Sequence, residues 1–462
     1  MLSSAVSLVH SVVWSGPLLI FLLGVGIALT FTLRGLQIRY LWYALKLAFL
    51  GPGAKSDNAE GDISHFQSLM TALASIIGIG NIVGVATAMA IGGAGALFWI
   101  WITALFGMAT TYAESLLAVK YRIKDKRGQM AGGPMYYLAN GMKSKWLAVL
   151  FAVGGCLAAL TTGNMVQANS MSDALSYSFG IEGWWVGIVI ASVIGVMILG
   201  GIKSIGKIAS YLVPIMAIFY VVCGSIIIIY KISELPHALS LIMASAFTGQ
   251  AAVGGFMGST LMMAMRMGVA RGLFSSEAGL GTTSIAAAAA RTDTPGRQAM
   301  IAMTGTFLST FLICTVTGLV LAVTGVLGEV GPDGKMLNGI SLAIRSFSTV
   351  MPFGGKVVNI GGFLFAVSTI LSWAYYGEKC VEYIFSERAI KPFRILFVAI
   401  IIVGCNLELN VVWNLADIAN GIMAVPNLIA IVALYPVIRK ETRYFLGLVA
   451  REKAEKKAGK KT

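Results

Sequence analysis

The stretch ASIIGIGNIVGVATA, residues 74–88, is apolar enough to cross a lipid bilayer, yet it carries Gly78, Gly80 and Asn81 in its middle. Glycine destabilises the interior of a helix, and a side-chain amide is costly in lipid. A helix interrupted here leaves backbone N–H and C=O groups without helical partners inside the membrane. Such groups are tolerated only where they are buried in protein or line a cavity. We therefore predict a membrane-spanning helix that is broken in its middle and faces a ligand or an ion.

The composition agrees with a membrane protein. Of the 462 residues, 57% are hydrophobic and 12% are charged, about half of the roughly 25% charged residues of a soluble chain. We expect an all-α integral membrane protein with eleven transmembrane helices in a single membrane domain, residues 1–462. Its apolar segments lie at 15–34, 67–92, 94–119, 147–170, 184–202, 208–230, 251–289, 298–327, 355–377, 393–411 and 415–438.

The basic residues predict how the chain is oriented. If the C-terminus is cytoplasmic, 28 of the 34 Lys and Arg residues fall on the cytoplasmic side. The excess of positive charge inside thus predicts an outer N-terminus in a multi-pass plasma membrane protein of bacterial type. We expect this face to contact anionic lipid and see no need for a nucleic-acid partner. The basic tail, 439–462, ends in REKAEKKAGKKT, residues 451–462, a run expected to be solvated and disordered.

A second glycine-rich span, VGGFMGSTLMMAMRMGVARGLFSSEAGLGTTS, occupies residues 253–284. Without the extra N-terminal helix at 15–34, the other ten spans divide into two sets of five, 66–230 and 251–438, each led by a broken helix. An odd number of spans per set makes the two repeats inverted. Paired broken helices in inverted repeats point to the binding site of a secondary transporter. The alternative is that these glycines only permit close helix packing.

The chemistry of the two breaks suggests what they bind. Freed amides at the N-terminus of a half-helix attract an anion, and freed carbonyls attract a cation. A site with both suits a zwitterion together with a metal ion. The sequence GIKSIGKI, residues 201–208, lacks the Ser or Thr and the preceding strand of a phosphate-binding loop. His10, His65 and His237 are far apart, so nothing indicates an enzyme.

The run GGAGALFWIWITALFGMA, residues 92–109, resembles the signature of the alanine/glycine:cation symporter family, part of the amino acid-polyamine-organocation superfamily. The resemblance extends through GIGNIVGVATA (78–88), GGPMYYL (132–138), GNMVQANS (163–170), RGLFSSEAGLGT (271–282) and LSWAYYGE (371–378). Two departures are Ile100, where the family usually has Met, and Ile79, where members commonly carry Thr.

This resemblance implies a symporter that imports small neutral amino acids with sodium by alternating access. Alanine, glycine, D-alanine and serine are the expected substrates, and sodium is the coupling ion with no organic cofactor. A proton-coupled amino acid transporter is the alternative. An ion channel and a receptor that binds without translocation are further alternatives. The implied fold is an eleven-helix version of the five-plus-five inverted repeat, and the sequence does not indicate an oligomeric state.

The resemblance also implies the positions of the ligands. The substrate carboxylate is expected against the amides of Gly78, Gly80 and Asn81, and the backbone from Phe274 to Gly279 is expected to close the other side. The expected cation ligands are the carbonyls near Ala74, Ile77 and Phe365 and the hydroxyls of Ser368 and Thr369. Hard oxygen ligands suit a small hard cation.

Three further residues, Gln167, Thr369 and Trp373, are expected at the substrate. Thr161, Asn164 and Gln167 recur every three residues and would share one helical face, so Gln167 can meet a ligand as donor and acceptor or bond a neighbouring helix. Thr369 and Trp373 lie four residues apart and also share a face, so Trp373 can form an apolar wall or simply pack in the core.

Charged residues within spans are functional candidates. Glu277 follows the second break close to Arg271 and Arg266, which predicts a gating pair or a brace for the broken helix. Glu114 is expected to reach the cytoplasmic surface near Lys120, and Asp417 is expected to be hydrated near an outer end. None of these patterns indicates a proton carrier in the middle of the membrane, which favours sodium as the coupling ion. Glu277 leaves proton coupling as an alternative.

Overall fold

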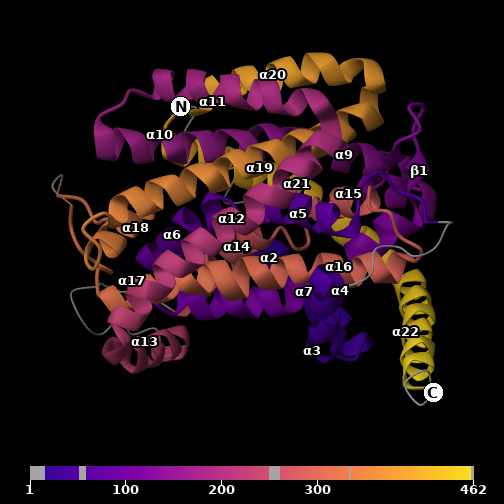
Figure 1. Cartoon of the computed structure of the whole chain (residues 1–462), viewed down its shortest axis with the longest axis horizontal. Helices are drawn as coiled ribbons and strands as arrows, with labels where there is room; N and C mark the ends of the chain where they lie inside the picture. The colour runs from indigo at the N-terminus through magenta and orange to yellow at the C-terminus, as the bar shows by residue number, and fades with distance from the viewer. Residues whose placement is uncertain (1–15, 51–58, 249–260, 332–333, 459–462) are drawn as a thin grey trace.

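The computed structural model describes residues 16–50, 59–248, 261–331 and 334–458, and they form an almost entirely helical bundle. Most of the long helices run in one common direction (Figure 1). Within the described residues, six helices are long and apolar enough to cross a membrane, or seven if one bent pair counts as a single span. The mostly helical, membrane-spanning architecture is therefore confirmed, and the count of eleven spans stays a prediction.

The first half of the chain contains both long helices and short connecting elements. Its elements are α2 (Gly16–Thr32), α3 (Leu36–Arg39), α4 (Leu41–Leu50), α5 (His65–Ile76), η1 (Ile79–Asn81), α6 (Val83–Gly92), α7 (Ala96–Lys120), β1 (Ile123–Lys124), β2 (Met130–Ala131), α8 (Pro134–Tyr136), η2 (Tyr137–Gly141), α9 (Lys145–Leu160), η3 (Thr161–Met165), α10 (Val166–Phe179), α11 (Gly183–Met197), η4 (Ile198–Gly200) and α12 (Gly201–Tyr230). Strands β1 and β2 pair antiparallel in a short hairpin.

The second half continues in the same style and ends in a helix that the sequence did not predict. Its elements are η5 (Ile232–Glu234), α13 (Leu235–Thr248), α14 (Leu261–Ser276), α15 (Thr283–Ala288), α16 (Pro295–Phe307), η6 (Leu308–Cys314), α17 (Thr315–Thr324), α18 (Gly339–Ser348), α19 (Gly354–Phe385), η7 (Glu387–Ala389), α20 (Ile390–Gly404), α21 (Leu409–Ala433) and α22 (Tyr435–Ala458). Residues 253–260 of the second glycine-rich stretch lie outside the described residues.

The helix is interrupted at the first glycine-rich stretch. A capping box starts α5, because the Ser64 hydroxyl accepts from the Gln67 N–H and the Gln67 side chain accepts from the Ser64 N–H. The helix ends at Ile76, and the chain bends by 61° before continuing through η1 and α6. Gly78, in the bend, has extended backbone. The interruption therefore falls where the glycines and Asn81 predicted it.

The second interruption follows Ser276, the last residue of α14. Glu277, Gly279 and Gly281 all have positive φ, of 52°, 90° and 79°. Left-handed backbone cannot continue a right-handed helix, and the helix resumes only at Thr283 in α15.

Two helices from different parts of the chain hold the broken helices in place. Helix α7 packs against α14, α15 and α16, and α19 packs against α5, α9, α10 and α12. Helices α6 and α14 also contact each other directly. The two breaks are thus brought together in the interior of the bundle.

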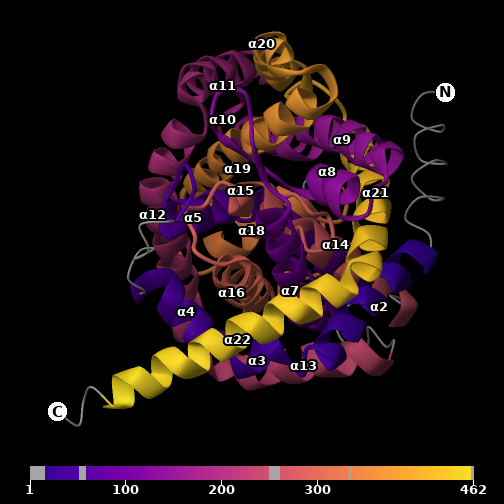
Figure 2. The same cartoon turned by 90° about the vertical axis from the view of Figure 1, so that its right-hand side faces the viewer.

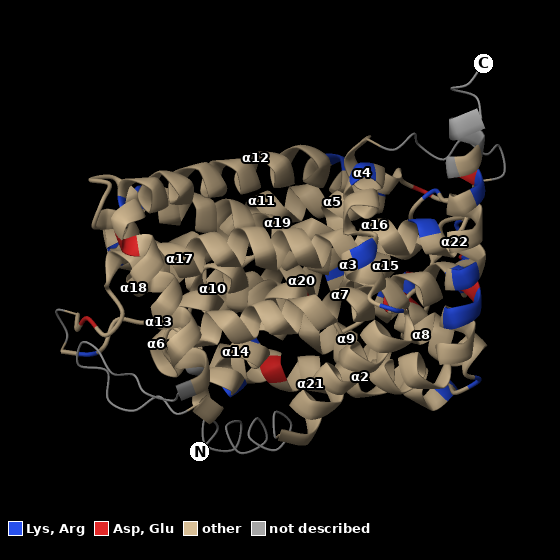
Figure 3. Ribbon diagram, turned by 90° about the horizontal axis from the view of Figure 1, so that it is seen from below, with Lys and Arg blue, Asp and Glu red and all other residues tan. Residues whose placement is uncertain are grey.

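The basic residues gather mainly at one end of the bundle, beside α22 (Figure 3). Helix α22 crosses that end as a long diagonal rod (Figure 2). The tail was expected to be disordered in residues 451–462, and this is wrong as far as Ala458, where α22 ends.

Helix α22 buries one mostly apolar face against the bundle. The charged composition of the tail gave no indication of this face. Its buried side chains are Ile438, Thr442, Phe445 and Val449, spaced three to four residues apart as on one face of a helix. Phe445 packs directly on Gly296 of α16, where an added Cβ would lie 2.5 Å from the Phe445 Cβ. Such packing stabilises a helix whose other faces are highly charged.

Two ion pairs also link α22 to the bundle. The Lys120 ammonium lies 2.8 Å from a Glu441 carboxylate oxygen, and Arg297 pairs with Glu452 at 2.6 Å. Exposed pairs of this kind contribute little on their own. The buried apolar face is therefore the main support of α22.

Phe445→Ala should lower the free energy of unfolding by about 3–5 kcal/mol, because truncation of a buried Phe leaves a cavity. The measurement is the melting temperature of the purified protein in detergent. Tyr444→Ala, at a side chain that is 60% exposed, is the matched control and should change little. Equal melting temperatures for the two variants would contradict the docking of α22.

Candidate functional site

The two helix breaks face one cavity. The cavity has a volume of only about 10 Å³, about the space that one water molecule needs. Its lining comes from α5, η1, η3, α10, α14, the second break and α19. Seven of the eight residues predicted to contact substrate line it, namely Gly78, Gly80, Asn81, Gln167, Phe274, Thr369 and Trp373.

The eighth predicted residue, Gly279, does not line this cavity. A Cβ added there would lie 2.5 Å from a Leu22 methyl group, and φ is +90°. Its carbonyl accepts a hydrogen bond from Asn427 Nδ2 at 2.8 Å. Gly279 therefore shapes the second break rather than the cavity wall.

The amides of the first break are partly used by the protein itself. The Gly78 N–H donates to Asn81 Oδ1 at 3.1 Å, and the Asn81 N–H donates to the Gly78 carbonyl at 3.0 Å. The Ile79 N–H donates to Gln167 Oε1 at 3.0 Å. Among the described residues the Gly80 N–H has no hydrogen-bond partner. Of the three amides expected at a substrate carboxylate, only that of Gly80 is therefore uncommitted.

Asn81 also joins the first break to another helix. Its Nδ2 donates to the Ser309 hydroxyl at 2.8 Å and to the Ser309 carbonyl at 3.2 Å. The Ser309 hydroxyl in turn lies 3.2 Å from the Ile76 carbonyl and 3.1 Å from the Ser275 carbonyl. Asn81 and Ser309 thus satisfy backbone groups at the ends of α5 and α14.

The polar stripe predicted from Thr161, Asn164 and Gln167 is not formed. Residues 161–165 form a turn of π-helix, so the spacing of an α-helix does not apply there. The Thr161 hydroxyl bonds back to the Leu157 carbonyl, and Asn164 Nδ2 donates to Phe397 O at 2.6 Å. Only Gln167 reaches the cavity, where its Nε2 donates to the Thr162 carbonyl at 3.1 Å.

Trp373 approaches the cavity because a glycine faces it. A Cβ on Gly163 would lie 2.1 Å from the Trp373 Cβ, so only glycine allows this contact between η3 and α19. The Trp373 side chain is 1% exposed, and its Nε1 donates to Glu277 Oε1 at 2.9 Å. Trp373 is therefore both a wall of the cavity and a hydrogen-bond donor.

The predicted cation ligands include a connected group of oxygen atoms. The Thr369 hydroxyl lies 3.0 Å from the Ala74 carbonyl, and the Ser368 hydroxyl lies 2.9 Å from the Phe365 carbonyl and 3.4 Å from that of Ala74. All these residues and Ile77, at the end of α5, are buried. Neutral hydroxyl and carbonyl oxygens are a donor set that fits a small hard cation.

The gating pair predicted between Glu277 and Arg271 does not form. Arg271 Nη2 lies 3.4 Å from Asp417 Oδ2, and the guanidinium lies 4.4 Å from the centroid of the Trp413 ring. Asp417, expected to be hydrated, is only 5% exposed, and Arg266 is exposed. The prediction relied on closeness in the sequence, whereas α14 ends at Ser276 and Arg271 pairs with Asp417 of α21.

Glu277 instead lies among neutral donors. Its Oε2 accepts from Thr282 Oγ1 at 2.5 Å and from Ser75 Oγ at 3.3 Å. Since Ser75 belongs to α5, this carboxylate connects the second break to the first broken helix. The predicted role as a brace is compatible with these contacts.

Glu114 was predicted to reach the surface, and this is wrong. Its side chain is completely buried, and Oε1 accepts from Asn427 Nδ2 at 2.6 Å. Asn427 Oδ1 in turn accepts from the Tyr137 hydroxyl. Helix α22 covers the end of α7, where Tyr112 donates to Thr442, so Glu114 has no path to the surface along α7. Asn427, an amide within an apolar span, was the sequence signal for this network.

A cluster of contacts that sequence reasoning missed joins the two broken helices at the basic end. Arg122 donates to the carbonyls of Ala288, Ala290 and Glu60 at 2.9, 2.7 and 2.8 Å. The chain before α5 is thereby bound to the chain after α15, and bridges between Ile63 and Ala290 support the same contact. We call this group the Arg122 clamp.

Beside it, the β1–β2 hairpin is held to α19 by charges. Lys379, almost completely buried, lies 3.3 Å from Asp125 and 3.1 Å from Glu382, and Arg127 pairs with both acids. Burial alone would raise the pKa of Asp125, but hydrogen bonds from the Gln129 backbone and Lys379 outweigh it and lower that pKa. Asp125, Glu382 and Glu387 are the group of acids in the described chain close enough for a metal, and two cations, Arg127 and Lys379, already pair with Asp125 and Glu382.

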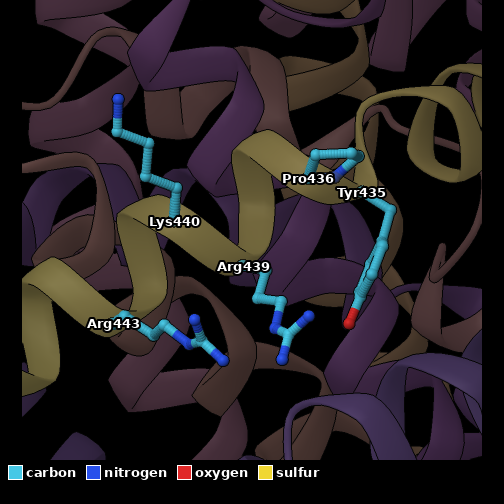
Figure 4. Close-up of a pocket in the computed structure, with 5 residues that line it drawn as sticks. All are labelled: Tyr435, Pro436, Arg439, Lys440 and Arg443. Atoms are coloured by element: carbon cyan, nitrogen blue, oxygen red, sulfur yellow. The ribbon is translucent and has the colours of Figure 1, made fainter.

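A larger hollow of about 390 Å³ lies far from the breaks, on α22. It is lined by Tyr435, Pro436, Arg439, Lys440 and Arg443 (Figure 4). Three cations and an aromatic side chain along an exposed helix do not make a cavity for a zwitterion buried in the bundle.

A helical membrane bundle with two interrupted helices around one small buried cavity defines a membrane transporter. The chain belongs to the sodium:alanine symporter family, whose model matches residues 1–460. It is 50% identical to the sodium/alanine symporter AgcS of Methanococcus maripaludis, over 96% of this chain and 97% of that protein. It is 36% identical to the probable sodium/glutamine symporter GlnT of Bacillus subtilis, over 95% and 89% of the two chains.

Solved structures agree on the fold. The crystal structure of MhsT in complex with L-phenylalanine matches with a TM-score of 0.61, at 14% identity, over 81% of this chain and 89% of that one. The manganese transporter of Eremococcus coleocola matches with a TM-score of 0.51, at 14% identity, over 82% and 81%. One of these structures holds L-phenylalanine and the other is a manganese transporter, so at this low identity the likeness concerns the fold alone.

Asn81→Ala should lower the free energy of unfolding by about 1–3 kcal/mol, because it leaves buried backbone groups of the first break unsatisfied. Thermal melting of the purified protein measures this loss. Asn406→Ala is the control, since the exposed side chain of Asn406, in the turn after α20, donates only to the carbonyl of Ile402 one turn earlier. A loss no larger for Asn81→Ala than for the control would mean that the break does not depend on Asn81.

Proposed function

We propose that the protein imports a small neutral amino acid together with sodium, by alternating access to the cavity between the two breaks. The observation that carries this proposal is that cavity, which backbone and polar groups of both interrupted helices line. Membership of the sodium:alanine symporter family supports the general process of amino acid and cation symport.

The size of the cavity supports a small substrate. Phe274 and Trp373 form two of its walls, and its volume is about 10 Å³, so these walls would have to move apart to admit even a small amino acid. Alanine, glycine, serine and D-alanine are the proposed substrates. The printed names of two relatives differ in the amino acid, alanine for one and glutamine for the other. The substrate therefore has to be argued from the cavity of this chain and not from the family alone.

The oxygen atoms around Thr369 support sodium as the coupling ion. Ala74, Ile77 and Phe365 would offer carbonyl oxygens, and Ser368 and Thr369 would offer hydroxyls. Such a site is next to the first break, so binding of a cation there would stabilise the interrupted backbone that the substrate also needs. Proton coupling is the alternative, and the buried carboxylates of Glu277 and Glu114 keep it open.

The Arg122 clamp supports alternating access. It joins the ends of both broken helices on the basic face, which we propose to be cytoplasmic. Release of substrate to that side would require the clamp to open. The proposed arrangement has an outer N-terminus, a cytoplasmic C-terminus, eleven spans in a plasma membrane of bacterial type, and two inverted repeats of five helices after α2.

The test is uptake of labelled alanine by proteoliposomes under an inward sodium gradient. We expect saturable accumulation above the equilibrium level, and a proton gradient alone should not replace sodium. Competition by glycine, serine, D-alanine and leucine will order the substrates. Current without saturable exchange would indicate a channel, and binding without accumulation would indicate a receptor.

Gly80→Leu should abolish this uptake while the protein still folds. An added Cβ at Gly80 would lie 2.8 Å from the Phe274 ring, and a Leu side chain would fill the space that the ligand needs. Gly24→Leu is the matched control, because a Cβ there meets nothing within 4 Å. Uptake by Gly80→Leu at the rate of the control would show that Gly80 serves only helix packing.

We also propose that the basic face of α22 contacts anionic lipid. The hollow of Figure 4 presents Arg439, Lys440 and Arg443 just after the apolar helix α21, where phospholipid phosphates would lie. Each basic side chain near an anionic membrane surface contributes about 1 kcal/mol.

Replacement of Arg439, Lys440 and Arg443 by Gln should weaken retention of phosphatidylglycerol by the purified protein, by about 1 kcal/mol per charge removed. Native mass spectrometry of the protein with bound lipid measures retention. The control replaces three other exposed lysines, Lys203, Lys207 and Lys391. Equal loss in both triple variants would mean a general charge effect without a role for α22.

A further inference from the structure

Glu277 is a buried carboxylate in the wall of the cavity. Its side chain is 2% exposed and comes from the second break. Oε1 accepts one hydrogen bond, from Trp373 Nε1, and Oε2 accepts two, from Ser75 Oγ and Thr282 Oγ1. An ionised carboxylate has about four acceptor positions. These three donors therefore leave acceptor capacity on a group that faces the cavity.

The charge of this carboxylate has no partner of opposite sign in the part of the chain that the structure describes. All three of its donors are neutral, and Arg271, the basic residue one turn and a half earlier, pairs with Asp417. A buried charge without a counter-charge is strongly unfavourable. A carboxylate retained in such a place is stabilised when a cation enters the cavity.

The backbone at Glu277 has an unfavourable conformation for a residue with a side chain. The second break contains three residues with positive φ, and the other two are glycines, Gly279 and Gly281. Glycine adopts this conformation without strain, whereas Glu277 at φ +52° does so at an energetic cost. Strain of this kind persists where function requires it. In the second break, the backbone is therefore strained at Glu277 and unstrained at Gly279 and Gly281.

The part of the cavity wall at the first break has the complementary character. Gly80, whose N–H is uncommitted among the described residues, lines the cavity just before α6 begins. The N-terminal end of a helix carries a partial positive charge and favours a carboxylate. The cavity therefore has a positive side at the first break and a negative side at Glu277. This is the charge pattern of an α-amino acid in its zwitterionic form.

We propose that the Glu277 carboxylate binds the ammonium group of the substrate and selects amino acids over hydroxy acids and simple carboxylic acids of the same size. This inference rests on the proposed function. Trp373, Ser75 and Thr282 hold the carboxylate in place. Because Ser75 belongs to α5 and Glu277 to the second break, the ammonium would join the two broken helices when the substrate binds.

The test compares alanine with lactate, which replaces the ammonium by a hydroxyl and keeps the carboxylate and the methyl group. Binding of labelled alanine to the purified protein in sodium buffer, with unlabelled alanine or lactate as competitor, gives both affinities. Wild-type protein should prefer alanine. Glu277→Gln, which keeps the shape and an acceptor oxygen, should lose about 10- to 150-fold in alanine affinity, the loss expected for a hydrogen bond to a charge. Its lactate affinity should change little.

Glu277→Asp is the matched control because it keeps the charge. It should keep the preference for alanine over lactate even if the affinity falls. Size-exclusion chromatography and the melting temperature establish that each variant is folded. If Glu277→Gln does not fold, Glu277→Asp decides alone, since loss of the alanine preference in a variant that retains the charge overturns the proposal.

The other outcomes are equally decisive. Unchanged alanine affinity in Glu277→Gln would leave Glu277 as a brace or a proton carrier and overturn the proposal. An equal loss of alanine and lactate affinity would also overturn it, because the side chain would then organise the whole cavity. If wild-type protein neither binds nor transports any amino acid, the proposed function itself fails, and the inference fails with it. If wild-type protein transports alanine and Glu277→Gln binds alanine with unchanged affinity, this inference fails while the proposed function stands.

Discussion

The structure depends on one constraint: a peptide group that leaves a helix inside a membrane must find another partner. Both breaks meet this requirement with polar side chains from other helices. Gln167 of α10 accepts from the Ile79 N–H, Asn81 bonds Ser309 of η6, and Asn427 of α21 donates to the Gly279 carbonyl. These contacts fix the breaks in space and explain why amides and hydroxyls are buried in so apolar a chain.

The same constraint limits how many backbone groups remain free to bind a ligand. Most amides of the first break are already paired, so the protein pre-organises the backbone and leaves few groups uncommitted. Pre-organised dipoles lose little entropy when a ligand binds. A small cavity with a few oriented polar groups is suited to a small and strongly polar solute, and Phe274 and Trp373 are the large aromatic side chains of its lining.

The broken helices are also the elements through which the two sides of the bundle can communicate. Ser309 contacts the ends of α5 and α14, Glu277 bonds Ser75, and the Arg122 clamp joins the chain before α5 to the chain after α15. A change at the cavity therefore bears on both interrupted helices together. Short half-helices between fixed partners are the kind of element that can move as units about a hinge.

Local properties of the sequence determined the membrane class, the positions of both breaks and the basic end of the bundle. Hydropathy, glycine and charge act on the nearest residues or on the surrounding solvent, so they can be read without a fold. The family motifs and helical spacing together supplied the residues expected at the substrate, of which only Gly279 does not line the cavity.

Only the tertiary structure decided which polar groups meet. Arg271 pairs with Asp417, Glu277 bonds Ser75 and Trp373, and Glu114 is buried beside Asn427, partners that lie 96 to 313 residues apart in the chain. Helical spacing gave a wrong prediction at Thr161, because a π-turn breaks the periodicity that such spacing assumes. Helix α22 was missed for a related reason: its charges are visible in the sequence, whereas the surface that buries its apolar face comes from α7 and α16.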